Sequence, residues 1–316
     1  MRLPNEKRLG EKYGWVENSN QKGACGRYPQ ARLCVLTDVR NRLALHTCWV
    51  PWKQSERDWA LEHLAQMAAA DLALLDRGFA SFELFAAFVQ RQHGFVCRCP
   101  THSFAVVNQL FEENKAGRSG TVTVRPCAGQ RARRRRLGLP EEITVRFVTV
   151  RLSTGELEVL ATNLLAEQRY PTEECGPLDG HRWGIETYYG LLKNRLDLEN
   201  FSGTTVAAVQ QDVYATIFLS NLESILIQPA QEQLREKSQS LKNAQQVNHA
   251  VSFHTRKSQI ITLLLSHDPM AEVLPKLEKL FLSNPVSIRP DRKVPRTERS
   301  AWRSYHHQRN KKKVVF

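Results

Sequence analysis

The hydrophobic and polar positions of this chain predict strands and helices in alternation over its first hundred residues. Two β-rich runs, ARLCVLTDV and RLALHTCWV, flank a short polar turn at Arg40-Asn41, which is typical of a hairpin. Apolar residues then recur at helical spacing from Trp52 to Met67. A short apolar strand at residues 73–75, a helix at 82–90 and the strand GFVCRCP follow. This order predicts an α/β arrangement.

The pattern changes in the middle of the chain. Between residues 104 and 168, the segments TVTVRP, ITVRFVTVRL and ELEVLATNL alternate apolar and polar residues as antiparallel strands do. An Arg-rich stretch between the first two has a loop-like composition. After Pro177 the spacing becomes helical, and we expect helices at 180–198, 205–228 and 230–252, with two shorter pieces to about residue 282.

These patterns divide the chain into five parts. We expect a loose polar segment, the first part of a core, a β-rich insertion, the remainder of the core with C-terminal helices, and a disordered basic tail. Their bounds are 1–27, 28–103, 104–168, 169–284 and 285–316.

The charge of the chain indicates a polyanionic partner. It has 45 Lys and Arg against 32 Asp and Glu in 316 residues, a formal net charge of +13. The charge is uneven, because the 28 residues from Arg289 to the end carry a net +8. A second cluster comprises Arg131 and Arg133 to Arg136. Both runs are either solvated, flexible segments or contacts to DNA phosphates, and the second interpretation fits the remaining signals better.

The cysteines and the apolar runs indicate in which cellular compartment the protein resides. Seven scattered cysteines do not form a disulfide framework in a chain of this length. Cys97-x-Cys99 with His102 lacks a fourth ligand for zinc, so we interpret these cysteines as reduced, partly buried thiols. The N-terminus has no apolar core of a signal peptide, and no apolar run is long enough to cross a membrane. We expect a soluble, cytoplasmic, nucleoid-associated protein.

One predicted helix carries charges that suggest chemistry. In HRWGIETYYGLLK, Arg182, Glu186 and Lys193 are four and seven residues apart, which returns them to nearly the same side of a helix, with Tyr189 alongside. A carboxylate between two cations suits a divalent metal beside a phosphodiester. A surface helix with ordinary Glu and Lys pairs has the same pattern.

Three ordered blocks extend this signal. They are R-x3-E-x6-K followed by LENFSG, the stretch LALLDRGFASFELFAAFVQRQHGFVCRCP, and the β-rich ITVRFVTVRLSTGELEVLATNLL. Together they resemble the DDE transposases of the insertion-sequence-four family. The resemblance runs from Tyr28 to about Ser266 and implies an RNase H-like catalytic core with a β-strand insertion, a helical C-terminal region and a basic tail.

The resemblance also implies roles for individual residues. Asp76, at the end of the strand LALL, and Glu186 would be catalytic and would ligate Mg²⁺, for which Mn²⁺ can substitute. Trp183 would pack its helix against the core. The residues expected at DNA are Arg182, Lys193, Tyr189, Arg77, Arg133 and Arg134, although Arg77 has the alternative of pairing with an acid. Strand-ending aspartates are also common as turn or N-cap residues.

The sequence departs from this family in two places. The family's first aspartate lies on a strand ahead of the polar segment in which this chain opens, and residues 1–27 contain no aspartate. Asp38 ends a hairpin strand, where the family does not keep a catalytic acid. We expect the absent strand to leave an unpaired sheet edge and the chain to be N-terminally truncated and inactive alone. In addition, the family usually has a tyrosine three residues before the arginine, whereas this sequence has Asp179. An aspartate there would cap the helix and repel DNA.

Three functions follow from these observations. The first is a DNA transposase that acts on insertion-sequence ends and target DNA, with a homodimer in the transposition complex. The second is a non-catalytic DNA-binding or dimerising fragment that interferes with the full-length enzyme. The third is an unrelated basic nucleic-acid-binding protein, against which the ordered blocks argue.

Overall fold

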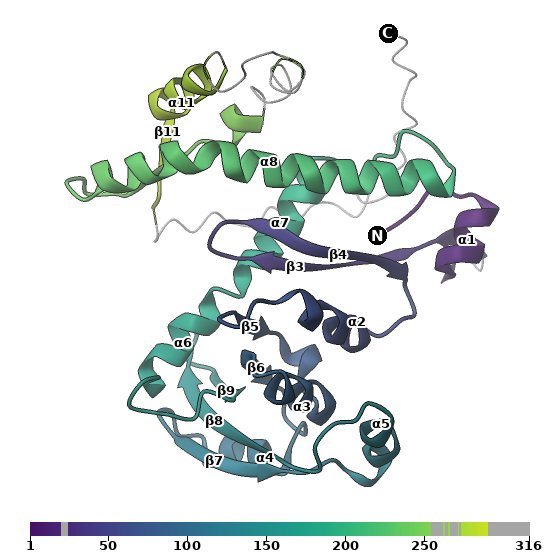
Figure 1. Ribbon diagram of the computed structural model, residues 1–316, viewed down its shortest axis with the longest axis vertical. Helices are drawn as coiled ribbons and strands as arrows, with labels where there is room; N and C mark the ends of the chain where they lie inside the picture. Colours follow the sequence, from purple (N-terminus) through teal and green to yellow (C-terminus); the bar gives the residue numbers. More distant parts are fainter. Residues whose placement is uncertain (20–24, 254–261, 263–264, 266–270, 272, 290–316) are drawn as a thin grey trace. The chain divides into compact units, whose positions relative to one another are not determined.

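The computed structural model describes residues 1–19, 25–253, 262, 265, 271 and 273–289 (Figure 1). These residues form two compact units. One contains residues 30–39 and 45–189, and the other contains residues 1–29, 40–44 and the chain from Gly190 onward. Most of the predicted basic tail lies outside the described residues.

A five-stranded mixed sheet is the centre of the first unit, with the strand order β5-β6-β9-β8-β7 (Figure 1). Strands β5 and β6 are parallel, and the other neighbours are antiparallel. The strand bounds are β5 Leu72–Leu75, β6 Gly94–Cys99, β7 Ser119–Val124, β8 Ile143–Arg151 and β9 Leu157–Thr162. The segment that we predicted as an insertion therefore continues the sheet, because β9 pairs directly with β6.

Side-chain alternation gives this sheet two different faces. Phe95, Cys97 and Cys99 point into a core with helices α3 (Phe82–Gln90) and α4 (Ala105–Glu113). Val96, on the opposite face, packs with Cys175 of helix α6 (Thr172–Gly180). Helix α3 is apolar on most sides, in agreement with its burial in the larger core. Charged residues on the α6 face therefore lie beside a much smaller apolar cluster.

The predicted hairpin is confirmed, and it forms a sheet of its own. Strands β3 (Ala31–Asp38) and β4 (Leu43–Pro51) pair with each other, and β5 is an edge strand of the five-stranded sheet. Helix α2 (Glu56–His63) follows β4 and begins at the N-cap Ser55, whose side chain accepts a hydrogen bond from the backbone of Arg57. A 3₁₀ turn, η1 (Leu64–Gln66), extends it, as the helical spacing predicted.

The N-terminal segment is more regular than its composition predicted. Instead of a loose stretch, residues 1–19 form helix α1 (Lys7–Tyr13) and strand β1 (Trp15–Ser19), which pairs with β2 (Cys25–Pro29). Buried Leu9 and Tyr13 hold α1 in place. Scattered apolar residues of this kind are too few to show a periodicity in sequence, but they are sufficient for one short helix.

The C-terminal helices are arranged differently from the prediction. Helix α8 runs without interruption from Val206 to Ser238, although we predicted a break near Pro229. Packing compensates for the backbone hydrogen bond that proline removes, because Ile227, Ala230 and Leu234 lie in one core with helix α11 (Leu274–Ser283). Strands β10 (Gln245–Val247) and β11 (Pro285–Ser287) pair nearby, so the start of the predicted disordered tail is a strand.

The Arg-rich stretch is a helix and not the loop that we predicted. Helix α5 (Arg131–Arg136) follows the 3₁₀ turn η3 (Ala128–Gln130). Arginine has a high helix propensity, and pairing with acids offsets part of the repulsion between neighbouring guanidinium groups. Arg133 pairs with Asp58, and Arg134 pairs with Glu141 at 3.2 Å.

Candidate functional site

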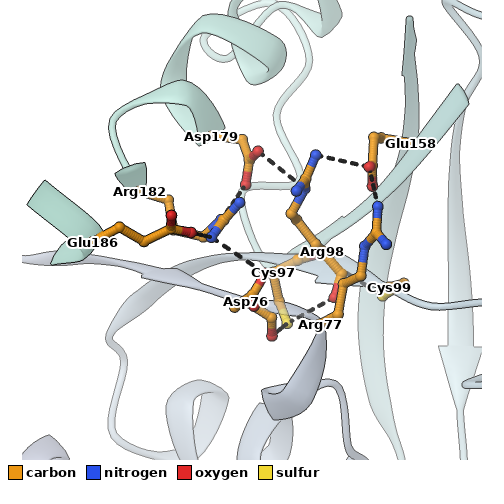
Figure 2. A network of polar contacts seen from close by, with 9 residues as sticks. All are labelled: Asp76, Arg77, Cys97, Arg98, Cys99, Glu158, Asp179, Arg182 and Glu186. Carbon is orange, nitrogen blue, oxygen red and sulfur yellow. Dashed lines mark hydrogen bonds and ion pairs between the residues drawn. The ribbon is translucent and has the colours of Figure 1, made fainter. Parts of the chain in front are cut away.

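Asp76 and Glu186, which are 110 positions apart in the sequence, approach the same guanidinium group (Figure 2). Asp76 directly follows β5 and precedes the 3₁₀ turn η2 (Arg77–Phe79). Glu186 lies in the first turn of helix α7 (Trp183–Asn194). One nitrogen of Arg182, Nη1, is 3.3 Å from Asp76 Oδ1 and 3.9 Å from Glu186 Oε1. The two carboxylates therefore face a common point.

Arg182 also connects this pair to a buried group of charges. Its Nε is 3.5 Å from Asp179 Oδ1, and the other oxygen of Asp179 is 3.3 Å from Arg98 Nε. Arg98 in turn pairs with Glu158 at 2.7 Å, and Arg77 pairs with the same Glu158 oxygen. Four carboxylates and three guanidinium groups form one connected chain of ion pairs, which we call the charge network (Figure 2).

The strand pattern explains how the network forms. Arg98 alternates with Cys97 and Cys99, whose side chains fill the large core, so its own side chain points to the α6 face. Glu158 lies two residues from Leu160 of the small cluster on that face, and Leu160 is the register partner of Arg98. Asp179 comes from the last turn of α6, which packs on this face.

Burial divides the network into two parts. Arg98, Glu158, Asp179 and Arg182 are between 1% and 8% exposed. The side chains of Asp76 and Glu186, in contrast, are each 53% exposed. Buried charges require partners, and each of the four has at least one opposite charge within 3.5 Å. The two exposed carboxylates are the ones that an ion or a substrate from solvent can reach.

Asp179 has a different environment from the one that we predicted. Instead of capping a helix beside DNA, it is buried between Arg98 and Arg182. Burial raises the pKa of its carboxyl group, although the two arginines act in the opposite direction. The two cations next to this carboxylate offset part of its negative charge.

Three other predicted residues have defined contacts. Arg77 was expected either to contact DNA or to pair with an acid, and it does pair with an acid, Glu158. Tyr189 donates a hydrogen bond from its hydroxyl to the carbonyl of Leu33 at 3.0 Å, and burial raises its pKa. Trp183 was expected to pack against the core, but this prediction is wrong, since its side chain is 55% exposed. Its ring lies 5.6 Å from the Arg182 guanidinium carbon.

The remaining predicted residues are not members of the charge network. Lys193 is exposed in the last turn of α7. Arg133 and Arg134 belong to α5, where acids pair with both. Cys97 and Cys99, which we interpreted as reduced thiols, are fully buried and free, and the thiol of Cys97 contacts the backbone carbonyl of Asp76 at 3.6 Å.

Sequence reasoning did not identify Arg98 and Glu158 as members of the site. A signal was present, because each is the only charged residue of a largely apolar strand, GFVCRC for Arg98 and LEVLAT for Glu158. Such a charge on a buried strand requires an opposite charge nearby. The sequence does not show which residue supplies it.

The donor set of Asp76 and Glu186 fits a hard divalent cation. Both offer carboxylate oxygens, both are accessible, and they converge from two elements. Mg²⁺ in proteins is commonly held by one or two carboxylates together with water and substrate phosphates. Neither sulfur nor imidazole belongs to this pair, which disfavours softer metals.

Comparisons with known proteins place this geometry in context. The sequence matches the family described as transposase DDE domain over residues 2–222, a range that contains the whole charge network. It is 26% identical over 200 residues to the transposase InsG for insertion sequence element IS4 of Escherichia coli (strain K12). That alignment covers 62% of the chain and 43% of InsG, so the chain spans less than half the length of this relative.

Among solved structures, one similar chain comes from a cryo-EM structure of the piggyBac transposase synaptic complex with hairpin DNA. The sequence identity is 11% and the TM-score is 0.46, over 94% of this chain and 58% of the other. Among the described residues, no helix is long and apolar enough to cross a membrane.

Proposed function

The chain belongs to the transposase DDE domain family, and on this premise we propose that it cuts and joins DNA at insertion-sequence ends by two-metal phosphoryl transfer. The observation that carries the proposal is the convergence of Asp76 and Glu186 on one nitrogen of Arg182, at 3.3 and 3.9 Å. Both carboxylates are accessible and lie within the matched range.

We propose that Asp76 and Glu186 hold divalent metal, Mg²⁺ with Mn²⁺ as a substitute. When bound, a pair of such ions stabilises the attacking and leaving oxygens of an in-line displacement at phosphorus. Arg182 fixes the two carboxylates in position before metal and DNA arrive. Because it is 5% exposed and paired with three acids, its main task in this proposal is positioning, and any phosphate contact is secondary.

The same fold has room for a third carboxylate. Within the described residues, strand β5 is an edge of its sheet, so its outer backbone groups can accept a further strand next to Asp76. We propose that a further strand, which carries the family's first aspartate, pairs there and completes an RNase H-like core. In this proposal residues 1–316 without that strand bind DNA and lack full activity.

Phosphate contacts would come from accessible cations. Arg77 is 52% exposed at its side chain, and Lys193 is exposed as well. The arginines of α5 and Tyr189 were also predicted at DNA, and we propose that Arg131, Arg135 and Arg136 contribute most, since they are exposed. A homodimer acting at the two ends of an element, associated with the nucleoid, completes the proposal.

The first test is cleavage of DNA that carries the element's own ends, in Mg²⁺ and in Mn²⁺. The chain is compared with a version extended at its N-terminus by a strand that carries an aspartate. We expect only the extended version to nick DNA. In that version Asp76→Asn and Glu186→Gln should each lower nicking at least about 100-fold and change DNA affinity by less than about twofold, because a metal ligand is removed while the phosphate-binding cations remain.

Two results would lead elsewhere. If neither version nicks DNA but both bind it, the chain is a non-catalytic DNA-binding fragment, which is the second function that the sequence suggests. If the chain nicks DNA unextended and Asp38→Ala stops it, the proposed source of the third carboxylate is incorrect. Glu113→Gln is a matched control, because Glu113 pairs with Arg118 outside the charge network.

A further inference from the structure

A second group of metal-ligand side chains lies apart from the charge network, between strand β4 and helix α2. His46 and Cys48 are two residues apart on β4 and therefore share one side of the strand. His63 is the last residue of α2. One nitrogen or sulfur atom from each of the three lies within 4.8 Å of the other two. Nothing in the proposed transposition chemistry uses these residues.

The distances are close to those of a tetrahedral zinc site. His46 Nδ1 is 2.8 Å from His63 Nδ1 and 3.8 Å from Cys48 Sγ. Bond lengths of about 2.0–2.1 Å for Zn–N and about 2.3 Å for Zn–S give tetrahedral edges of ~3.3 Å between nitrogens and ~3.6 Å between nitrogen and sulfur. The distance from His46 Nδ1 to Cys48 Sγ already fits such an edge, and the two histidine Nδ1 atoms need to separate by about half an ångström.

The contact between the two histidines has one proton to share. Their Nδ1 atoms face each other at 2.8 Å, so one ring donates and the other accepts. A metal at this point would take the lone pairs of both Nδ1 atoms in place of the shared proton. His63 Nε2, which is buried and has no hydrogen-bond partner in the described part of the chain, lies outside this contact.

The chemistry of the three side chains suits a metal. Neutral imidazoles offer their lone pairs directly, whereas the thiol becomes a ligand when the metal displaces its proton.

We propose that His46, Cys48 and His63 bind one Zn²⁺ ion, with water in the fourth position. Binding releases the thiol proton of Cys48, so the site with its thiolate has a net charge of +1. Two imidazoles and a thiolate are ligands that zinc prefers, unlike the carboxylate pair of Asp76 and Glu186. The ion ties the end of α2 to strand β4 and stabilises the folded chain by binding it in preference to the unfolded chain.

Cobalt substitution tests the site directly. The full chain, freed of metal with a chelator, is titrated with Co²⁺, which takes zinc sites and reports a thiolate ligand through a charge-transfer band. We expect a thiolate band that saturates at one Co²⁺ per chain and is displaced by one equivalent of Zn²⁺ but not by a large excess of Mg²⁺. Zn²⁺ should also raise the melting temperature.

Matched variants separate this cluster from other sites. Cys48→Ser should abolish the thiolate band. His63→Gln should lower the affinity for Zn²⁺ at least about tenfold. Cys127→Ser and His102→Asn replace an exposed cysteine and an exposed histidine and should bind normally. Asp76→Asn should also bind Zn²⁺ normally, so failure of the catalytic proposal would leave this one intact.

Two results would overturn the proposal. The first is a wild-type chain that gives no thiolate band with Co²⁺, which needs no variant and does not depend on how a variant folds. The second is a band that persists in Cys48→Ser and disappears in Cys127→Ser, which would assign the thiolate to another part of the chain.

Discussion

The charge network and helix α5 are both rich in arginine, but they differ in how far the arginines are buried. Arg98 and Arg182 are 8% and 5% exposed, and each is within 3.5 Å of at least one carboxylate. In α5, Arg131, Arg135 and Arg136 are exposed to solvent, whereas Arg133 and Arg134 pair with acids. One region uses arginine to hold acids in place, and the other presents three arginines to solvent.

The difference shows that a cluster of arginines in sequence does not define its role. A buried guanidinium has been stripped of water and depends on fixed carboxylates, so removing it leaves those carboxylates without compensation. An exposed guanidinium retains its water and gives up little when a phosphate replaces a counterion. Substitutions should therefore reduce stability in the charge network and reduce DNA binding in α5.

The largest expected effect is on Arg98, which connects Asp179 and Glu158. Arg98→Ala leaves two buried acids with fewer cations and should lower the free energy of unfolding by about 3–5 kcal/mol. Urea denaturation followed by circular dichroism measures this change. Arg125→Ala is the matched control, because Arg125 pairs with Glu142 at the surface and should cost less than about 1 kcal/mol. Equal losses in the two variants would mean that the buried pairs contribute no more than exposed ones.

A smaller effect is expected when the exposed arginines of α5 are replaced. Replacing Arg131, Arg135 and Arg136 together with glutamine should lower DNA affinity roughly tenfold or more at moderate salt. The dependence of log affinity on log salt should become shallower by about 0.9 for each phosphate that the variant no longer neutralises. Fluorescence anisotropy over a salt series measures both quantities.

The paired arginines of α5 provide the comparison for this result. Replacing Arg133 and Arg134 with Gln removes the same kind of charge, but acids already neutralise both residues. We expect a smaller decrease in DNA affinity than for the exposed set. A larger decrease would favour Arg133 and Arg134 over the exposed set as DNA contacts.

The pH dependence of stability tests the balance at Asp179. Its pKa in the folded protein is raised above the ordinary 3.8, mainly by burial, against the opposing effect of Arg98 and Arg182 and with a further rise from Glu158. A raised carboxyl pKa contributes stability that is complete below the unfolded value and is lost as the pH rises through the folded value. Asp179→Asn does not ionise at this position and escapes that loss.

The wild-type chain should therefore lose stability relative to Asp179→Asn as the pH rises above 3.8. Urea midpoints of both proteins across the acidic range give the difference. If the wild type instead gains on the variant as the pH rises, the ion pairs with Arg98 and Arg182 outweigh the cost of burial.

The smallest expected effect concerns Trp183, which lies next to Arg182 but belongs to the exposed surface. Trp183→Ala should lower the free energy of unfolding by less than about 1 kcal/mol, the range of one exposed contact between a cation and a ring. Trp49→Ala is the buried control and should cost about 3–5 kcal/mol. A large decrease at Trp183 would mean that it packs more tightly than its exposure indicates.

Local patterns in the sequence were sufficient for several elements. The turn at Arg40-Asn41 between two β-rich runs predicted the hairpin of β3 and β4, and helix α3 has the predicted bounds of 82–90. These predictions depend on residues close in the chain, where alternation and helical spacing act directly. Predictions failed where packing outweighed composition, as at Pro229 inside α8 and in the helix at Lys7–Tyr13.

The residues of the candidate site also fall into those that the sequence identified and those that only the tertiary structure revealed. The order of motifs in the sequence singled out Asp76, Glu186 and Arg182, and the chain's membership of a transposase family is shown. Only the tertiary structure brought Arg98, Glu158 and Asp179 to Arg182, or His63 to His46 and Cys48. Periodicity tells which face of a strand or helix a side chain occupies. The partners of a buried charge, and the other ligands of a metal site, come from residues far along the chain. Which of them arrive within a few ångströms is decided by how strands and helices pack, and that information is not local.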